Sequence, residues 1–319
     1  MQFNIWQQGT VVKNGFSGII DNIVALEPDL IAFSEVRNYK NVEFIPYLVN
    51  ELAKRGKKYY GNPSVSTGII SKYKIEKQEI IYPLKNDRGS VLKVHITIHD
   101  KPVVFYSAHL DWLNCSSYLP RGYNASDWHK LDAPVTDVDS ILKNNRMSFR
   151  LAEVRAIIED AKKEIKNGAI ILIGGDFNEP SLLDWQQDTK DIRDHQGLVI
   201  NWDCSLLLTN EGYIDAFRAC FPDPVDYPGF TFPADSKDVE LKKLVWAPDA
   251  DERERIDFIY FHPFCGLTLS DIRLVGPSGT ILRGERTAND SQDVFLEPTG
   301  VWPTDHKGLL ATFTLNDPE

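Results

Sequence analysis

The chain has 319 residues, of which 42% are hydrophobic and 25% are charged, a composition typical of a folded globular protein. No apolar run reaches the roughly 20 residues that a membrane-spanning helix needs, so we expect a soluble protein. A formal net charge of −11 argues against a protein that holds nucleic acid mainly through a broad basic surface, although carboxylates balanced by bound cations still permit a nuclease.

The first part of the chain is predicted to alternate strands and helices. Residues 2–6 resemble a strand, and because the chain starts almost inside this element, removal of an upstream leader and export are one interpretation. Apolar spacing predicts a helix over Gly15–Leu26, which Pro28 ends. A short apolar strand over residues 29–35 follows and terminates in a carboxylate, Glu35, and a second helix is predicted over residues 45–55.

The middle of the chain is predicted to be rich in strands, over residues 68–71, 91–98 and 103–109, the last of which ends at His109. Residues 112–145 contain several aromatic residues, two prolines and many Asp and Asn residues, which predicts a long ordered loop. It begins with Trp112 and has two interpretations. The loop covers a cleft and selects the leaving group, or its aromatic residues form a local core.

A helix is predicted over residues 146–165, and it places Arg146 and Arg150 on one face because they are four residues apart. Contact with a substrate phosphate and simple solvation are both compatible with this spacing.

An apolar run over residues 170–173 stops at Gly174 and Gly175 and is followed by Asp176 and Asn178. This pattern is typical of a buried strand whose glycines permit close approach of backbone or ligand. Strand alternation then predicts that Asp176 and Asn178 point to the same side.

The last predicted strands are residues 255–261, with Asp257 inside an otherwise apolar segment, and residues 309–315, which follow Asp305 and His306. A buried acid is costly unless it is paired. The chain shows no internal repeat and no convincing linker. We therefore predict one domain over residues 1–319, an α/β sandwich of two packed mixed sheets flanked by helices, with the aromatic-rich insertion at about 112–145.

The four cysteines are widely spaced and form no CxxC pair, so a structural zinc site is not expected. The sequence does not decide whether Cys115, Cys204, Cys220 and Cys265 form disulfides.

Taken in order, these residues resemble the endonuclease/exonuclease/phosphatase superfamily, which includes pancreatic deoxyribonuclease and neutral sphingomyelinases. The resemblance covers the whole chain, through Asn4, Glu35, His109, the Gly174–Asn178 segment, the Arg255–Ile259 segment and the Asp305–His306 pair. It implies a four-layer α/β sandwich that hydrolyses phosphate esters with Mg²⁺, or Mn²⁺ in its place.

The resemblance also implies roles for individual residues. Glu35 would be the main metal ligand, assisted by Asn4 and Asp305. Asn178 would donate to a phosphate oxygen, and His109 would stabilise the transition state or serve the leaving group. The general base is left open between Asp176 and His306, the latter oriented by Asp257.

Two other functions are weighed against a phosphoesterase. A glycosidase would use paired carboxylates such as Glu35 and Asp176, but it leaves Asn178, Asp305 and His306 without a role. A silent binding protein on the same scaffold would be expected to lack at least one of these groups. We expect a monomer that acts on a phosphorylated substrate. The acidic charge favours a small metabolite, a lipid headgroup or a sugar phosphate, without excluding nucleic acid.

Overall fold

The computed structural model describes residues 1–263 and 266–315, and Cys265 lies outside them. The α-helices are α1 Gly15–Leu26, α2 Phe44–Lys54, α3 Val138–Asn145, α4 Arg150–Lys166, α5 Asp203–Asn210 and α6 Ala216–Cys220. The strands are β1 Gln2–Asn4, β2 Leu30–Val36, β3 Ser66–Ser71, β4 Lys77–Tyr82, β5 Ser90–Ile98, β6 Lys101–His109, β7 Ile170–Asp176, β8 Ile214–Asp215, β9 Asp257–Phe261, β10 Leu267–Val275, β11 Thr280–Leu282, β12 Glu285–Thr287, β13 Phe295–Leu296 and β14 Gly308–Leu315. Short 3₁₀ turns lie at Gln7–Gly9, Tyr39–Asn41, Ser116–Tyr118 and Leu241–Lys243.

Most strands belong to two six-stranded mixed sheets. The first has the order β13-β10-β14-β1-β2-β3, and the second has the order β4-β5-β6-β7-β9-β8. At the centre of the first sheet β1 runs parallel to β2 and antiparallel to β14. In the second, β7 runs parallel to β6 and antiparallel to β9. In each sheet, therefore, the central strands end at an edge where their terminal side chains can form a functional site.

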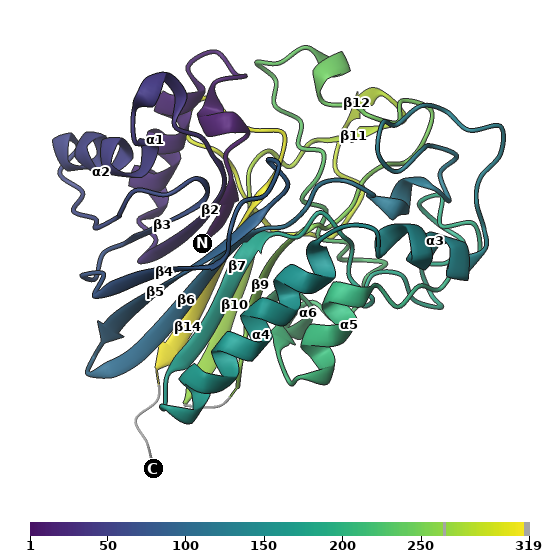
Figure 1. The fold of residues 1–319 in the computed structure, drawn as a ribbon. Coiled ribbons are helices and arrows are strands. Elements are labelled where there is room, and N and C mark those ends of the chain that lie inside the picture. The colour runs from purple at the N-terminus through teal and green to yellow at the C-terminus, as the bar shows by residue number, and fades with distance from the viewer. Residues whose placement is uncertain (264–265, 316–319) are drawn as a thin grey trace.

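Helices cover the outer face of each sheet, which gives four layers (Figure 1). The helices α1 and α2 bury Ile19, Ile23 and Leu48 against Phe3 and Phe33 of the first sheet. On the other side α4 and α5 pack their apolar faces against the second sheet. The predicted α/β sandwich is confirmed, with a third apolar layer between the two sheets.

The two sheets approach closely beneath the ends of β2, β6 and β7. Ser34 donates from Oγ to the carbonyl of Ala108 at 3.0 Å, and Ser107 donates to the carbonyl of Phe33 at 3.0 Å. A Cβ at Gly174 would stand 3.1 Å from the Cβ of Ala32 in the other sheet, and a Cβ at Gly175 would stand 2.1 Å from the carbonyl oxygen of Ala108 in the neighbouring strand β6. The glycines of the Gly-Gly pair therefore serve the close approach of backbone that the sequence predicted.

Several predicted boundaries differ from the observed ones for local reasons. The helix over Gly15–Leu26 is confirmed, but the first strand ends at Asn4 because Trp6 and Gln8 adopt left-handed backbone conformations, with φ of 35° and 62°. The predicted helix over 146–165 starts at Arg150 instead, since the segment after α3 turns at Ser148 before α4 begins.

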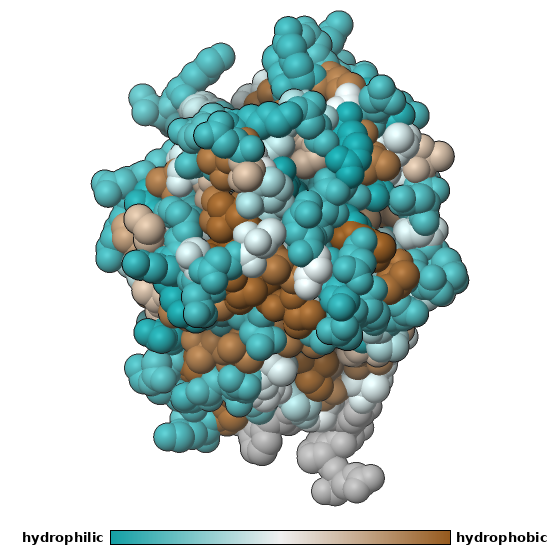
Figure 2. All heavy atoms as spheres, turned by 90° about the vertical axis from the view of Figure 1, so that its right-hand side faces the viewer, coloured by the Kyte–Doolittle hydropathy of each residue, from teal (hydrophilic) through white to brown (hydrophobic). Residues whose placement is uncertain are grey.

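The insertion at 112–145 is ordered and contains the helix α3. Its apolar side chains Leu119, Ala125 and Ile141 pack with Trp185 and Trp202 in a cluster separate from the main layers. Figure 2 shows the side of the molecule on which α3 lies, where apolar groups form patches among hydrophilic ones. A local core therefore orders part of the insertion.

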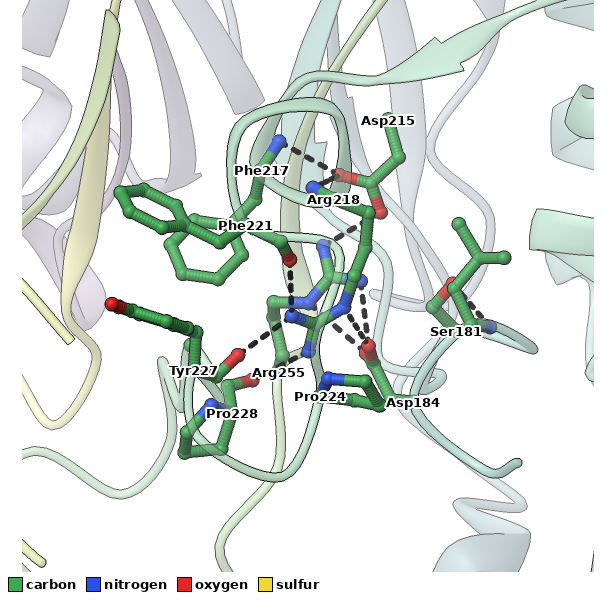
Figure 3. A network of polar contacts seen from close by, with 12 residues as sticks. Ser181, Asp184, Asp215, Phe217, Arg218, Phe221, Pro224, Tyr227, Pro228 and Arg255 are labelled. Atoms are coloured by element: carbon green, nitrogen blue, oxygen red, sulfur yellow. Dashed lines mark hydrogen bonds and ion pairs between the residues drawn. The ribbon is translucent and has the colours of Figure 1, made fainter. Parts of the chain in front are cut away.

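A buried network of charges precedes β9 (Figure 3). Arg255 donates to Asp184 at 3.0 and 2.9 Å and to Asp215 at 2.7 Å, and Arg218 donates to the same Asp184 at 2.7 Å. Because all four side chains are buried and paired, the network fixes the chain two residues before Asp257.

Within the described residues no helix is both long and apolar enough to cross a bilayer. Cys115, Cys204 and Cys220 are free thiols.

Candidate active site

Side chains from both sheets converge at one edge of the sandwich, around a cleft of about 430 Å³. Asn4 ends β1, Glu35 lies in β2, His109 ends β6, Asp176 ends β7, Asp257 begins β9, and Asp305 and His306 precede β14. Glu35, His109, Asp176, Asn178, Asp305 and His306 line the cleft. Asn4 and Asp257 are fully buried behind it.

Asn4 connects two carboxylates of the site. Its Nδ2 donates to Oδ2 of Asp176 at 2.9 Å and to Oε1 of Glu35 at 3.3 Å, while its Oδ1 accepts from the backbone N–H of Trp6 at 2.9 Å. The other carboxylate oxygen of Glu35 accepts from the N–H of Gln7 at 2.9 Å. Glu35 itself has φ of 65° at a bulge between β2 and β3, which turns its side chain toward the cleft. In this arrangement Asn4 positions the carboxylates through its side-chain amide N–H groups.

Asn178 lies beside Asp176, but not by strand alternation. β7 ends at Asp176, and Asn178 adopts a left-handed conformation with φ of 49° in the following turn. Its backbone N–H donates to Oδ1 of Asp176 at 2.9 Å, and its Nδ2 donates to the carbonyl of Leu110 at 3.0 Å. A turn, and not strand alternation, therefore places Asn178 beside Asp176. The prediction that both residues belong to one strand was wrong.

Asp257 and His306 form a buried pair. Nδ1 of His306 lies 2.8 Å from Oδ2 of Asp257, whose other oxygen accepts from Nε2 of Gln2 at 2.5 Å. The remaining ring nitrogen of His306 lies 3.9 Å from Oδ2 of Asp176 and 4.0 Å from Oδ1 of Asp305. With Asp257 fixing Nδ1, the Nε2 of His306 faces the carboxylates of the cleft.

Electrostatics in this cluster favour a protonated histidine. Burial alone would lower the pKa of His306, but the charges of Asp257, Asp176 and Asp305 raise it well above its ordinary value. Burial and the nearby charge of Asp257 raise the pKa of Asp176 to about 7. Burial also raises the pKa of Asp305 to about 7, with a further contribution from Glu35. The site thus gathers more negative charge than its histidine neutralises.

His109 is neutral by contrast. Burial, with the charges of Arg37 and His306, lowers its pKa to about 3. Its Nδ1 lies 3.0 Å from Oγ of Ser66 on β3. When the Ser66 hydroxyl donates to Nδ1, the Nε2–H of His109 remains available for a group in the cleft.

The donors of the site are chemically suited to a hard divalent cation. Asp176, Asp257 and His306 offer ligand atoms within 4.8 Å of one another. Asp257, however, is fully buried behind the cleft, where it accepts from Gln2 and His306, so it is a poor ligand in this arrangement. Glu35 and Asp305 are better placed because both line the cleft and the charge of Glu35 raises the pKa of Asp305, a repulsion that a bound cation would relieve.

The structure does not bring Arg146 and Arg150 to the cleft. Arg150 is fully buried and donates to the carbonyls of Asp111, Leu113 and Asn114 at 2.6 to 2.7 Å. Arg146 precedes α4 and forms a two-point pair with Asp203 at 2.8 and 2.9 Å, outside the residues that line the cleft. Arg150 instead fixes the backbone that leads from β6 into the insertion.

Trp112, by contrast, lines the cleft and donates from Nε1 to the carbonyl of Asp87 at 3.0 Å. Trp128 from the same insertion also lines it. The sequence left two interpretations of the insertion open. In the structure the insertion both forms a local core and lines one side of the cleft.

Several residues at the site were missed, among them Gln2, Arg37 and Trp246. Gln2 supports Asp257, and strand alternation from Asn4 was a signal for it, because both lie on β1 two residues apart. Arg37 lines the cleft two residues after Glu35. Trp246 reaches the cleft from a turn-rich segment whose sequence carries no recognisable pattern.

Comparison with known proteins shows the family of the chain. The model of the Endonuclease/Exonuclease/phosphatase family matches residues 1–306. The uncharacterized protein F14F9.5 of Caenorhabditis elegans is 30% identical over 273 residues, which cover 82% of this chain and 77% of that protein.

Solved structures share the fold at lower identity. D. rerio TDP2 complexed with a single strand DNA product has a TM-score of 0.54 and 17% identity, covering 98% of each chain. The human Nocturnin catalytic domain with a bound sulfate anion has a TM-score of 0.52 and 13% identity, covering 98% of this chain and 93% of that one. The chain belongs to the endonuclease/exonuclease/phosphatase family.

Proposed function

We propose that the protein hydrolyses phosphate esters with a divalent cation, Mg²⁺ or Mn²⁺, held by Glu35 and Asp305. The observation that carries the proposal is the connected set Asn4, Glu35, Asp176, Asp257 and His306, which hydrogen bonds and close ring-to-carboxylate distances join across the two sheets. When bound, such an ion supplies positive charge to a phosphate oxygen and to an attacking water. It also accounts for the excess of carboxylates in a buried place.

The chain's own residues divide the remaining work. Asp176 orients the attacking water and accepts its proton, because its carboxylate faces the cleft and Asn4 and Asn178 hold both of its oxygens. His306 keeps its proton beside three carboxylates and donates from Nε2 to the phosphate, while Asp257 orients the ring. His109 donates from Nε2 to a phosphate oxygen or to the leaving group.

The side chain of Asn178 is committed elsewhere, since its Nδ2 donates to the carbonyl of Leu110. We therefore propose that Asn178 mainly supports Asp176 and the backbone after His109. To contact a phosphate, its Nδ2 would have to give up the hydrogen bond to Leu110.

The lining of the cleft favours a small substrate. Arg37 is the one lysine or arginine that lines it among the residues the structure describes, and it pairs with Asp87. A duplex nucleic acid needs many cationic contacts along its phosphates. We infer a substrate with one phosphate at the site, and single strand DNA belongs in the test because a relative with this fold was solved with it.

A hydrolysis panel tests the proposal. Purified protein is given Mg²⁺ or Mn²⁺ with bis-p-nitrophenyl phosphate, p-nitrophenyl phosphate, inositol phosphates, sphingomyelin vesicles and single-stranded and plasmid DNA. A set of p-nitrophenyl glycosides is tested in parallel. We expect at least one phosphoester to be hydrolysed, with activity abolished by EDTA and restored by the metal. Activity that survives EDTA, or cleavage only of glycosides, would exclude the proposed function.

A further inference from the structure

One wall of the cleft is built from aromatic side chains, Trp112, Trp128, Trp246 and Tyr118, here called the aromatic wall. The rings of Trp112 and Trp128 lie nearly parallel, with centroids 6.2 Å apart and an angle of 14°. Trp246 contacts Trp128 with centroids 4.5 Å apart, and Tyr118 meets Trp128 edge-on at 6.2 Å. Two separate segments of the chain thus supply one continuous aromatic surface.

The wall is partly open to solvent, although aromatic side chains of this size are normally buried. Trp112 is 36% exposed and Trp246 is 43% exposed, and both line the same cleft as His306. Exposed indole rings inside a concave site mark a place where a ligand removes them from water. The catalytic groups proposed above are polar, so the wall must serve the rest of the substrate.

The charge behind the wall is negative. The carboxylate of Glu252 is buried and lines the cleft, and it accepts only from neutral donors, the hydroxyl of Tyr118 at 3.0 Å and the backbone N–H groups of Trp246 and Ala247 at 3.1 to 3.2 Å. No lysine or arginine of the described chain forms an ion pair with it. Burial raises the pKa of Glu252 to about 7, against a smaller opposing effect of the Arg121 charge, so a cation on the open side of the wall would favour the charged carboxylate.

The arginines near the cleft are already paired and do not attract additional anions. Asp87 and Glu254 line the same cleft, and their partners Arg37 and Arg121 already form ion pairs with them. A polyphosphate or a second nucleotide phosphate would find no free cation here.

We propose that the aromatic wall binds an organic cation, an alkylammonium group in the alcohol part of the phosphate ester. The proposal rests on the proposed function of the same cleft. A cation over the face of an indole ring is attracted by the ring's negative face, and tryptophan gives the strongest interaction of this kind. Glu252 adds a long-range attraction from behind the rings.

The direct test compares choline with its uncharged carbon isostere, 3,3-dimethylbutan-1-ol, in binding to the whole protein, measured by calorimetry and by tryptophan fluorescence. We expect choline to bind at least about fivefold more tightly than the isostere. Equal or weaker binding of choline would show that the wall recognises apolar shape alone and would overturn the proposal. So would tighter binding of adenosine 5′-monophosphate than of choline.

Variants assign the effect to the wall. Trp246→Leu and Glu252→Gln are each expected to weaken choline binding about fivefold or more while leaving isostere binding within twofold. Tyr47→Leu is the matched control, because Tyr47 is also 43% exposed but lies on α2 and does not line the cleft. Thermal unfolding confirms that each variant is folded. Loss of choline binding in Tyr47→Leu, or none in Trp246→Leu, would refute the assignment.

The outcome is separable from that of the proposed function. Hydrolysis of bis-p-nitrophenyl phosphate, which carries no cation, reports on the catalytic groups alone. If the protein prefers choline but hydrolyses no phosphate ester, cation binding by the aromatic wall is supported and the proposed function is refuted. If the protein hydrolyses a phosphate ester but does not prefer choline, the proposed function stands and cation binding by the aromatic wall is refuted.

Discussion

Arg150 provides a sharp test because the sequence and the structure assign it different roles. As a substrate-binding residue its removal would weaken substrate binding and leave the fold intact. In the structure it is fully buried and joins the backbone after β6 to Asn145, whose Oδ1 accepts from Nη2 at 2.6 Å. Arg150→Met keeps much of the side-chain volume and removes every donor.

The expected loss of stability follows from the acceptors that remain. Three backbone carbonyls and the amide oxygen of Asn145 lose a charged donor, and Glu179, 3.5 Å from Nε, loses its nearby positive charge. An unsatisfied buried group costs about 1–3 kcal/mol, and breaking a buried charged network from one side costs about 3–5 kcal/mol. Because relaxation and water entry recover part of the sum, we expect a loss of about 4 kcal/mol.

Urea unfolding of the wild type, Arg150→Met and Arg146→Met measures this loss. Arg146 is the matched control, since its side chain is 53% exposed and, within the described chain, donates only to Asp203, whose side chain is 10% exposed, so its removal should cost about 1–2 kcal/mol, less than that of Arg150. If Arg150→Met unfolds within about 1 kcal/mol of Arg146→Met while its KM rises, the structural role of Arg150 is refuted and the substrate role returns.

Three further predictions concern catalysis and pH. Asp176→Asn and His306→Ala should each lower kcat at least roughly a hundredfold without unfolding, because each removes a positioned proton-transfer or charged group. Glu35→Ala should raise the Mg²⁺ concentration needed for half-maximal activity in a metal titration. Burial raises the pKa of Glu153 from its ordinary value of 4.5 to about 8, so the folded protein binds a proton that the unfolded chain releases. The stability of the wild type should therefore fall relative to Glu153→Gln as pH rises from about 4.5 to about 8, by at most about 1.4 kcal/mol per pH unit, and the difference should level off above that range.

Each of these expectations has a contradicting result. Wild-type turnover in folded Asp176→Asn or His306→Ala would show that the chemistry lies elsewhere. An unchanged metal titration in Glu35→Ala would place the ion at other ligands. Parallel pH–stability curves for wild type and Glu153→Gln from urea unfolding would show that Glu153 is not held neutral in the folded state.

The layer architecture was predictable because its signals are local. The spacing of Phe16, Ile19 and Ile23 marks the buried face of α1, and uninterrupted apolar residues mark the core of β7. Boundaries were less predictable where a backbone turn depends on tertiary packing. The helix α4 starts at Arg150 after the turn at Ser148, and the side chain of Arg150 binds backbone carbonyls from a segment 36 to 39 residues earlier.

Much of the candidate site was predictable because its polar residues lie at or near the ends of strands that the sequence indicates. The sequence predicts Glu35, Asp176 and His306 as site residues, and the structure brings them to one cleft. The sequence did not indicate Trp246 or Glu252, because their turn-rich segment lacks the periodic apolar pattern of a helix or strand. The position of that segment depends on the fold around it. Distances between side chains of distant segments are a tertiary property that spacing along the chain does not encode.

The close contact of the two sheets through Ser34 and Ser107 has a consequence for how activity is acquired. Asn4 and Glu35 come from one sheet and Asp176 and Asp257 from the other, so neither half of the sandwich holds a competent centre. An intermediate that has formed each sheet but not joined them would show native-like far-ultraviolet circular dichroism and no turnover. The proposed hydrolytic activity would accordingly report that the two sheets have docked, rather than that secondary structure has formed.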